Sequence, residues 1–300
     1  MNEYSFCLPA YAKINRFLKI IGKRPDNFHE ICTSFQTVSL HDNLFFVESD
    51  EISLTCDNPV IPTDENNLII RAAQILKNEF DVKQGARIHL EKNIPSPGGL
   101  GGGSSNAAVA LLGLAGLWKL KINLETLCRI GALLGSDVPF FFYGGTALAA
   151  GRGTDIFPAE DIKDEFILIV IPAVEISTAQ AYDLLNSPRL TNSSSKRILK
   201  ICRQQAERQY LRQSNPENDF EKVIFKIESE IGRVKKRLLE TGAKSALLSG
   251  SGASVFGIFE NNETRQASLV ALENEHNWRK FAVATVSRAS YRENLKVVSE

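Results

Sequence analysis

The stretch Pro95-Ser96-Pro97-Gly98-Gly99-Leu100-Gly101-Gly102-Gly103-Ser104-Ser105-Asn106-Ala107-Ala108 carries the strongest structural signal in the chain. Five glycines lie within six residues, so the backbone can adopt positive φ angles and approach a ligand closely. An apolar run from 107 to 118 predicts a buried helix, with Ser104, Ser105 and Asn106 as candidate N-caps. Unpaired N–H groups and the positive end of the helix dipole would face the loop, which favours phosphate binding there.

Two common nucleotide-binding motifs do not fit this stretch. A Walker A loop ends in Gly-Lys-Ser/Thr, whereas Gly103 is followed by two serines. The G-x-G-x-x-G spacing of dinucleotide-binding proteins is absent as well. The alternative, a flexible glycine linker, is disfavoured because linkers do not usually run straight into a strongly apolar helix.

Composition describes an ordinary soluble protein of 300 residues, a length that suggests two domains. Lysine plus arginine equals aspartate plus glutamate at 35 each, which argues against a nucleic-acid partner bound by bulk charge. No apolar run is long enough for a membrane helix, and the N-terminus lacks a signal-peptide pattern. Five scattered cysteines indicate neither disulfides nor a zinc site, so we expect a cytoplasmic protein without a membrane partner.

Two polar positions lie in apolar surroundings. Residues 12–18 alternate as in a strand, which places Lys13 and Asn15 on one face. Asp137 is expected in a short loop between a helix over 124–134 and an apolar strand over 140–143. Such residues are commonly a solvated strand edge and a turn aspartate. An apolar setting, however, makes a carboxylate costly unless it has a partner or a function.

The remaining elements are expected as follows. Residues 44–54 predict two short strands, Asn66 or Asn67 caps a helix over 68–80, and a strand covers 86–90. Asn123 caps the helix over 124–134 and Gly135 ends it in the left-handed conformation. Further along, we expect strands over 166–171, 254–259 and 281–287, helices over 178–185, 198–211, 223–231, 234–241 and 264–277, and a second glycine turn over 249–253.

A polar segment over 155–164 marks the predicted domain boundary, giving domains of residues 1–160 and 161–300. Strands and helix pairs in the second part fit an α+β, ferredoxin-like half. From the residues alone, a phosphate loop, a lysine and a carboxylate fit phosphoryl transfer from a nucleotide to an alcohol. The carboxylate would accept the alcohol proton and the lysine would stabilise developing negative charge.

The glycine stretch resembles the phosphate loop of the galactokinase, homoserine kinase, mevalonate kinase and phosphomevalonate kinase (GHMP) superfamily. Three further segments resemble its motifs, in order along the chain: residues 9–15, 135–139 and 248–253. The resemblance implies a two-domain α+β fold, with an N-terminal half like ribosomal protein S5 and a ferredoxin-like C-terminal half. ATP and substrate would lie in the cleft between them, with Mg²⁺ held mainly by nucleotide phosphates and no protein ligand for the metal named.

The resemblance also implies roles for individual residues. Asp137 would be the proton acceptor, Lys13 its charged partner, and Asn15 would place the alcohol. The nucleotide phosphates would be wrapped by Pro95, Ser96, Pro97, Gly98, Gly99, Leu100, Gly101, Gly102, Gly103, Ser104 and Ser105.

Residues 22–30 resemble one branch of the superfamily, which phosphorylates the 2-hydroxyl of a cytidine-diphosphate-linked methylerythritol on the non-mevalonate route to isoprenoid precursors. Phe28 and Tyr182 resemble the two aromatic walls of its cytosine pocket, with His29 beside them. The sequence departs from the branch pattern at Asn27, usually glycine, and at Phe28, usually tyrosine. Arg16, usually apolar, is expected to point away from Lys13.

Alternatives remain open at this point. A related kinase for homoserine, mevalonate or a sugar would share the phosphate loop, but the 28–29 segment argues against it. A catalytically silent ligand sensor on the same fold would not need Lys13 and Asp137. The partner is expected to be a small molecule carrying a cytidine diphosphate group, and the protein a monomer or homodimer.

Overall fold

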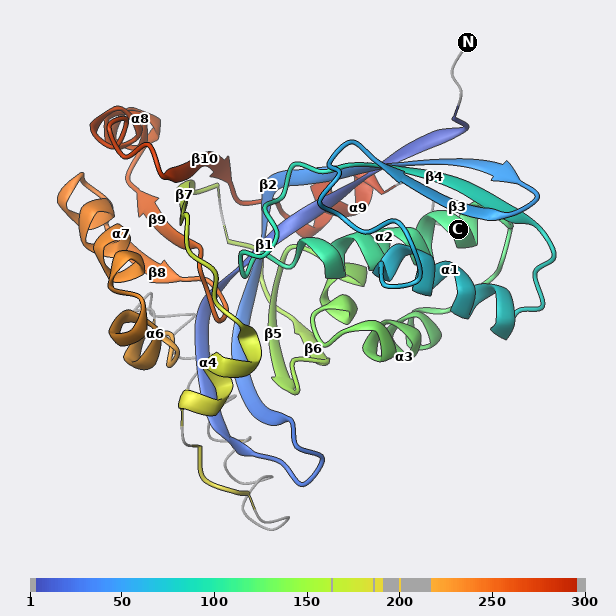
Figure 1. Ribbon diagram of the computed structural model, residues 1–300, viewed down its shortest axis with the longest axis horizontal. Coiled ribbons are helices and arrows are strands. Elements are labelled where there is room, and N and C mark those ends of the chain that lie inside the picture. Colours follow the sequence, from blue (N-terminus) through green and yellow to red (C-terminus); the bar gives the residue numbers. More distant parts are fainter. Residues whose placement is uncertain (1–3, 163, 186, 191–199, 201–216, 296–300) are drawn as a thin grey trace.

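Figure 1 shows the computed structural model, which describes residues 4–162, 164–185, 187–190, 200 and 217–295. Its strands are β1 (Phe6–Lys23), β2 (His29–Ser49), β3 (Ile52–Cys56), β4 (Gly85–Glu91), β5 (Thr146–Gly151), β6 (Asp155–Pro158), β7 (Phe166–Pro172), β8 (Ser245–Leu248), β9 (Val255–Phe259) and β10 (Trp278–Ala284). Its helices are α1 (Leu68–Glu79), α2 (Gly102–Leu117), α3 (Leu124–Leu134), the 3₁₀ turn η1 (Val138–Phe142), α4 (Thr178–Leu184), α6 (Glu221–Ile227), α7 (Ser229–Glu240), α8 (Asn262–Ala271) and α9 (Arg288–Asn294).

The first sheet contains β1 to β6 in the order β3-β4-β2-β5-β6, with β1 paired to β2. The β1–β2 hairpin is long and antiparallel, while β3 and β4 pair in parallel. Helices α1, α2 and α3 cover one face of this sheet (Figure 1). Helix α2 is buried on nearly every side because its sequence is apolar all round, and it packs on α1, β1 and β2.

The second sheet is antiparallel, in the order β10-β7-β9-β8. Alternation along β7 divides its side chains between two cores. Leu168 and Val170 join the core formed with α6 and α7, whereas Ile167 and Ile169 belong to a core shared with Ile14 of β1. The two sheets are therefore joined by packed apolar side chains.

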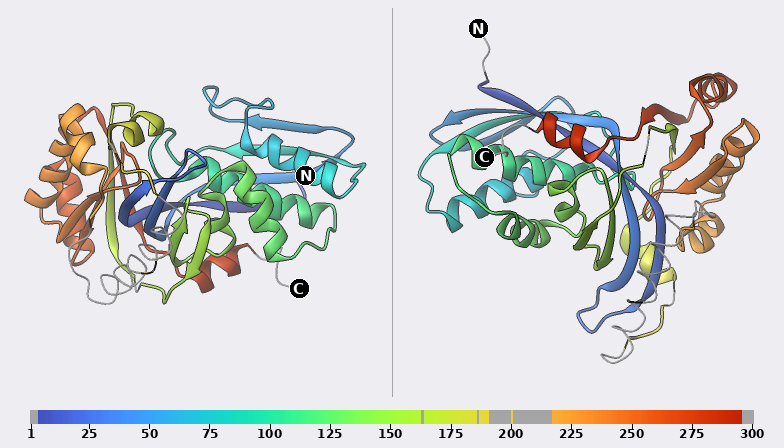
Figure 2. Two further views of the ribbon diagram at one scale, coloured as in Figure 1. Left: turned by 90° about the horizontal axis from the view of Figure 1, so that it is seen from below. Right: turned by 180° about the vertical axis from the view of Figure 1, so that it is seen from behind.

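The C-terminal part of the described chain returns to the first sheet. Figure 2 shows α9 beside the first half of the molecule, and the buried Tyr291 hydroxyl donates to the Phe141 carbonyl at 2.6 Å. We propose the boundary between residues 160 and 161, because β6 still pairs in the first sheet whereas β7 belongs to the second. In that division α9 belongs to the second domain by sequence and packs on the first.

Several expectations about local structure were wrong. Helix α2 begins at Gly102 because Gly101, with φ of 71°, is its N-cap, so Ser104, Ser105 and Asn106 lie inside the helix. Gly135 ends α3 in extended backbone rather than in the left-handed conformation. Residues 140–142 form part of η1 instead of a strand, since Pro139 lies at the start of a tight turn.

Other differences concern element length. Residues 44–49 continue the long strand β2, so the two short strands expected over 44–54 become the end of β2 and the separate β3. Ile231 belongs to α7, because α6 ends at Ile227. Helix α9 was not expected. The helix expected over 198–211 lies outside the described residues, apart from residue 200. No helix among the described residues is long and apolar enough to cross a membrane.

Candidate active site

The glycine loop connects β4 to α2 and contacts both halves of the molecule. Gly99 has φ of 72°, and a Cβ there would lie 2.2 Å from the Ser249 carbonyl oxygen, so only glycine fits. The Ser249 hydroxyl donates to the Gly99 carbonyl at 3.0 Å, and the Ser254 hydroxyl donates to the Gly98 carbonyl. The glycine turn of the second half thus holds the loop in place.

The start of α2 offers donors for an anion. Ser105 N–H donates to the Gly101 carbonyl at 2.8 Å, which leaves the preceding N–H groups of the helix without partners inside it. The Ser105 hydroxyl is fully buried and has no hydrogen-bond partner among the described residues. Close backbone, helix N–H groups and an unsatisfied hydroxyl are what a polyphosphate requires, so the loop fits the phosphates of a nucleotide.

Lys13 lies buried at the centre of the site, with its side chain 3% exposed. Its Nζ donates to Asn15 Oδ1 at 2.7 Å and to the Gly99 carbonyl at 2.9 Å, and lies 3.3 Å from Asp137 Oδ2. A buried ammonium group needs such partners to offset its loss of hydration. Lys13 and Asn15 share a face of β1, as predicted from their spacing.

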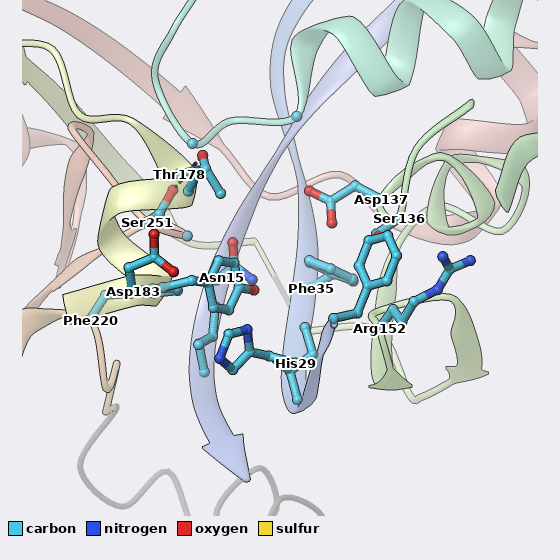
Figure 3. Close-up of a pocket in the computed structure, with 18 of the residues that line it drawn as sticks. Asn15, His29, Phe35, Ser136, Asp137, Arg152, Thr178, Asp183, Phe220 and Ser251 are labelled. Atoms are coloured by element: carbon cyan, nitrogen blue, oxygen red, sulfur yellow. Dashed lines mark hydrogen bonds between the residues drawn. The ribbon is translucent and has the colours of Figure 1, made fainter. Parts of the chain in front are cut away.

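Asn15 and Asp137 are held by different elements. Asn15 Nδ2 donates to the Thr33 hydroxyl of β2 at 2.8 Å, which fixes the amide orientation. Asp137 is the residue before η1 and its side chain remains 31% exposed, facing the cavity (Figure 3). A carboxylate that contacts both a buried cation and solvent can take up a proton from a bound alcohol.

A cavity of about 540 Å³ opens beside this group (Figure 3). Its lining includes Lys13, Asn15, Asp137, Gly99 and Gly101. It also includes all three residues expected to contact the base, Phe28, His29 and Tyr182. The sequence-predicted catalytic and base-binding residues are therefore brought together in one cavity. Their roles stay predictions.

The aromatic side chains of the cavity differ in their surroundings. His29 stacks on Tyr182 with ring centroids 4.6 Å apart and an interplanar angle of 17°, so one face of Tyr182 contacts this histidine. Phe220 meets Tyr182 edge-on at 4.9 Å. Phe28 remains 47% exposed at the hairpin tip. Asn27, the residue before it, has a φ of 65°. Glycine adopts this left-handed conformation most easily, which accounts for the glycine that is usual at this position.

Burial sets the protonation states of these rings. Burial lowers the pKa of His29 below its usual value, and the charge of nearby Lys23 lowers that pKa further while Asp183 opposes it. Burial, and secondarily the charge of Asp137, raises the pKa of the Tyr182 hydroxyl. Around pH 7 both rings are therefore neutral, which suits contact with an uncharged base.

Several cavity residues were not predicted from the sequence. Phe220 was interpreted only as part of a helix start, and Arg152 and Asp183 carried no recognisable signal. Thr178 and Ser251 contact each other through their hydroxyls at 3.0 Å, so α4 meets the second glycine turn there. The position of Ser251 inside that turn was the one available sign. Arg16, as expected, points elsewhere and pairs with Glu165.

The loop residues are not equivalent in the structure. Gly99 and Gly101 line the cavity, whereas Leu100 is buried in the core between the two sheets. The Leu100 carbonyl accepts the backbone N–H of Lys13 at 2.9 Å, so it couples the loop to β1. Nucleotide contacts by the other loop residues stay predictions.

Comparison with known proteins places the chain in a family. Residues 67–145 match the model of the GHMP kinases N terminal domain, and residues 189–277 match that of the GHMP kinases C terminal. The 4-diphosphocytidyl-2-C-methyl-D-erythritol kinase of Thermodesulfovibrio yellowstonii is 39% identical over 88% of this chain and 93% of its own. The enzyme of that name from Syntrophotalea carbinolica is 39% identical over 94% of this chain and 99% of its own.

Solved structures agree with the sequence relatives. A crystal structure of 4-(cytidine 5'-diphospho)-2C-methyl-D-erythritol kinase matches with a TM-score of 0.75 at 30% identity, covering 93% of this chain and 99% of its own. A homoserine kinase from Cytophaga hutchinsonii has a TM-score of 0.69 at 18% identity, with 96% of each chain covered, a likeness that shows the shared fold alone. The chain belongs to the GHMP kinases and, within them, to the 4-diphosphocytidyl-2-C-methyl-D-erythritol kinase family.

Proposed function

We propose that the protein transfers the γ-phosphoryl group of ATP to the 2-hydroxyl of 4-diphosphocytidyl-2-C-methyl-D-erythritol. One observation carries the proposal: Asp137, 3.3 Å from the buried Lys13, shares a cavity with Phe28 and Tyr182 beside the glycine loop. A proton acceptor, a phosphate cradle and aromatic side chains that can hold a base are thus adjacent. The curated relatives named above carry the same activity in their names.

In the proposed reaction Asp137 accepts the proton of the 2-hydroxyl, and Asn15 orients that hydroxyl. The freed oxygen attacks the γ-phosphorus of ATP, the bond from that phosphorus to its bridging oxygen breaks, and ADP leaves. Lys13 stabilises the negative charge that develops between the reacting oxygens. Mg²⁺, held mainly by the nucleotide phosphates, would neutralise part of their charge.

The glycine loop is proposed to hold the nucleotide. Backbone N–H groups of residues 101–103 and the Ser105 hydroxyl would donate to its phosphate oxygens, since these groups lack partners within the helix. Gly99 keeps the loop against the second glycine turn, and Leu100 ties it to β1 beside Lys13. Nucleotide and proton acceptor would thereby be held on the same rigid support.

The cytosine ring is proposed to lie between Phe28 and the side of the cavity formed by Tyr182 and His29. A neutral His29 has one ring nitrogen that donates and one that accepts, so it can read the hydrogen-bonding edge of the base. Stacking of a base on an aromatic side chain contributes about 1–3 kcal/mol. The rings would thus distinguish a cytidylated substrate from a free polyol.

Replacing Phe28 or Tyr182 by alanine is expected to weaken binding of the cytidylated substrate but not of ATP. Phe28→Ala and Tyr182→Ala should each raise its Michaelis constant by about ten-fold or more, because one stacking contact is lost. The Michaelis constant for ATP should stay within two-fold of the parent value, on the order expected for a distant site. Steady-state kinetics with each substrate varied in turn measure both constants.

Phe157→Ala is the matched control, because Phe157 is a partly exposed aromatic residue outside the cavity lining. It should leave both Michaelis constants unchanged. If the Phe28 and Tyr182 variants fold and bind the cytidylated substrate as the parent does, these rings do not form its base pocket.

A further inference from the structure

Phe28 lies on a short turn with little core packing around it. It follows the β1–β2 turn, and its ring is 47% exposed. The turn itself is hydrogen-bonded: Arg24 N–H donates to the Phe28 carbonyl at 2.8 Å, and Phe28 N–H donates to Asp26 Oδ1 at 3.2 Å. These bonds fix the backbone but leave the ring to be held by something else.

Arg152 is the side chain that meets this ring. Its guanidinium carbon lies 4.5 Å from the Phe28 ring centroid, within the range of a cation–π contact. Arg152 lines the cavity on the side of Ser136 and Asp137, opposite Asp183 (Figure 3). Among the described residues Arg152 forms no ion pair with a carboxylate, and the Phe28 ring is the aromatic partner of its guanidinium group.

A buried carboxylate fixes the backbone on both sides of this contact. Glu30, two residues after Phe28, has a side chain only 3% exposed. Its Oε2 accepts from Arg24 Nη1 at 2.6 Å, and its Oε1 accepts from the Gly151 N–H at 3.0 Å. One carboxylate therefore joins the hairpin turn to the end of β5, directly before Arg152. Together with the pairing of Ile31 with Gly151 in the sheet, this link holds the turn that carries Phe28 close to Arg152.

We propose that Arg152 is a positioning residue for substrate specificity, which holds the Phe28 ring in place as one wall of the pyrimidine pocket. The inference rests on the proposed function and extends it to a residue outside the base contacts named there. A ring already held in its binding orientation loses less rotational freedom when the base stacks on it, so affinity rises. Arg152 acts through Phe28 and does not touch the reacting atoms.

The test is a double-mutant cycle over Arg152→Ala and Phe28→Ala, with Arg152→Lys as the conservative variant. Arg152→Ala should raise the Michaelis constant for the cytidylated substrate about three- to thirty-fold, the effect of one cation–π contact, with turnover and the ATP constant unchanged. In the Phe28→Ala background the same change should have no further effect, because the ring is gone. Arg152→Lys, which keeps the cation, should restore part of the affinity.

A second readout separates this inference from the proposed function. The parent, the two alanine variants and the double variant are titrated with cytidine 5'-diphosphate by calorimetry, which needs no turnover. Arg129→Ala on α3 serves as an arginine control outside the cavity. Failure of the parent protein to phosphorylate the cytidylated substrate would contradict the proposed function, while the calorimetric cycle still tests Arg152. The positioning role would be overturned if Arg152→Ala bound the cytidylated ligand as the parent does. It would also be overturned if the fold-losses of affinity of the two single variants multiplied in the double variant.

Discussion

Asp137→Asn is expected to lower turnover by roughly 10²–10⁴-fold, the contribution of a general base to such a reaction. Asparagine has the same shape but cannot accept the alcohol proton at neutral pH. Lys13 would keep its hydrogen bonds to Asn15 and to the Gly99 carbonyl, so the site should remain assembled. Turnover at saturating ATP and substrate, with ATP affinity measured separately, checks this expectation.

Fold and charge controls accompany this variant. Asp50→Asn changes an exposed aspartate in the turn between β2 and β3 and should leave turnover as in the parent. The melting temperature of the Asp137→Asn protein shows whether the loss of its contact with buried Lys13 affects folding. If the folded variant keeps most of its turnover, Asp137 is only a turn residue and another group accepts the proton.

Gly102→Val is expected to have the second large effect, lowering kcat/KM for ATP by about 10²-fold. A Cβ at Gly102 would lie 2.9 Å from Ile94 Cγ2 and 3.2 Å from Lys92 Nζ. Lys92 cannot move aside easily, because its Nζ donates to the buried carboxylate of Asp42 at 2.7 Å. The helix start must then shift, and a misplacement of about 1 Å can cost on the order of 10²-fold.

The matched control is Gly232→Val in α7, where a Cβ would make only ordinary contacts at 3.5 Å or more with Phe225. It makes the same glycine-to-valine change within a helix without touching the loop. Kinetics with ATP varied, and nucleotide binding by calorimetry, distinguish the two variants. Unchanged ATP affinity in a folded Gly102→Val protein would contradict a phosphate-binding role for this helix start.

Local signals in the sequence were sufficient for much of the fold. Period-two alternation placed Lys13 and Asn15 on one face of β1, and Asn67 and Asn123 cap the helices expected of them. These features depend on neighbours a few residues apart, which the sequence displays directly. The helix start was misplaced because Gly101, a residue without a side chain to signal a cap, takes that position.

The parts of the site that escaped prediction depend on long-range contacts. Arg152 reaches the cavity from the turn that follows β5, and Phe220 from the residue before α6, and nothing in their local sequence reports that proximity. The stacking of His29 on Tyr182 joins residues that lie far apart in the chain. Distances of this kind follow from how the two halves pack, and the apolar core around Ile14 and Ile169 fixes that packing.

A substrate panel with MgATP is the sharpest test of whether this GHMP kinase acts on a cytidylated polyol. ADP release is measured with 4-diphosphocytidyl-2-C-methyl-D-erythritol, uncytidylated methylerythritol, homoserine, mevalonate and galactose at equal concentrations. We expect efficient turnover of the cytidylated compound, with turnover of the others lower by about 10²-fold or more, since each lacks the base that would stack in the cavity. Phosphorylation of homoserine, mevalonate or galactose at least as efficiently as the cytidylated compound would contradict it.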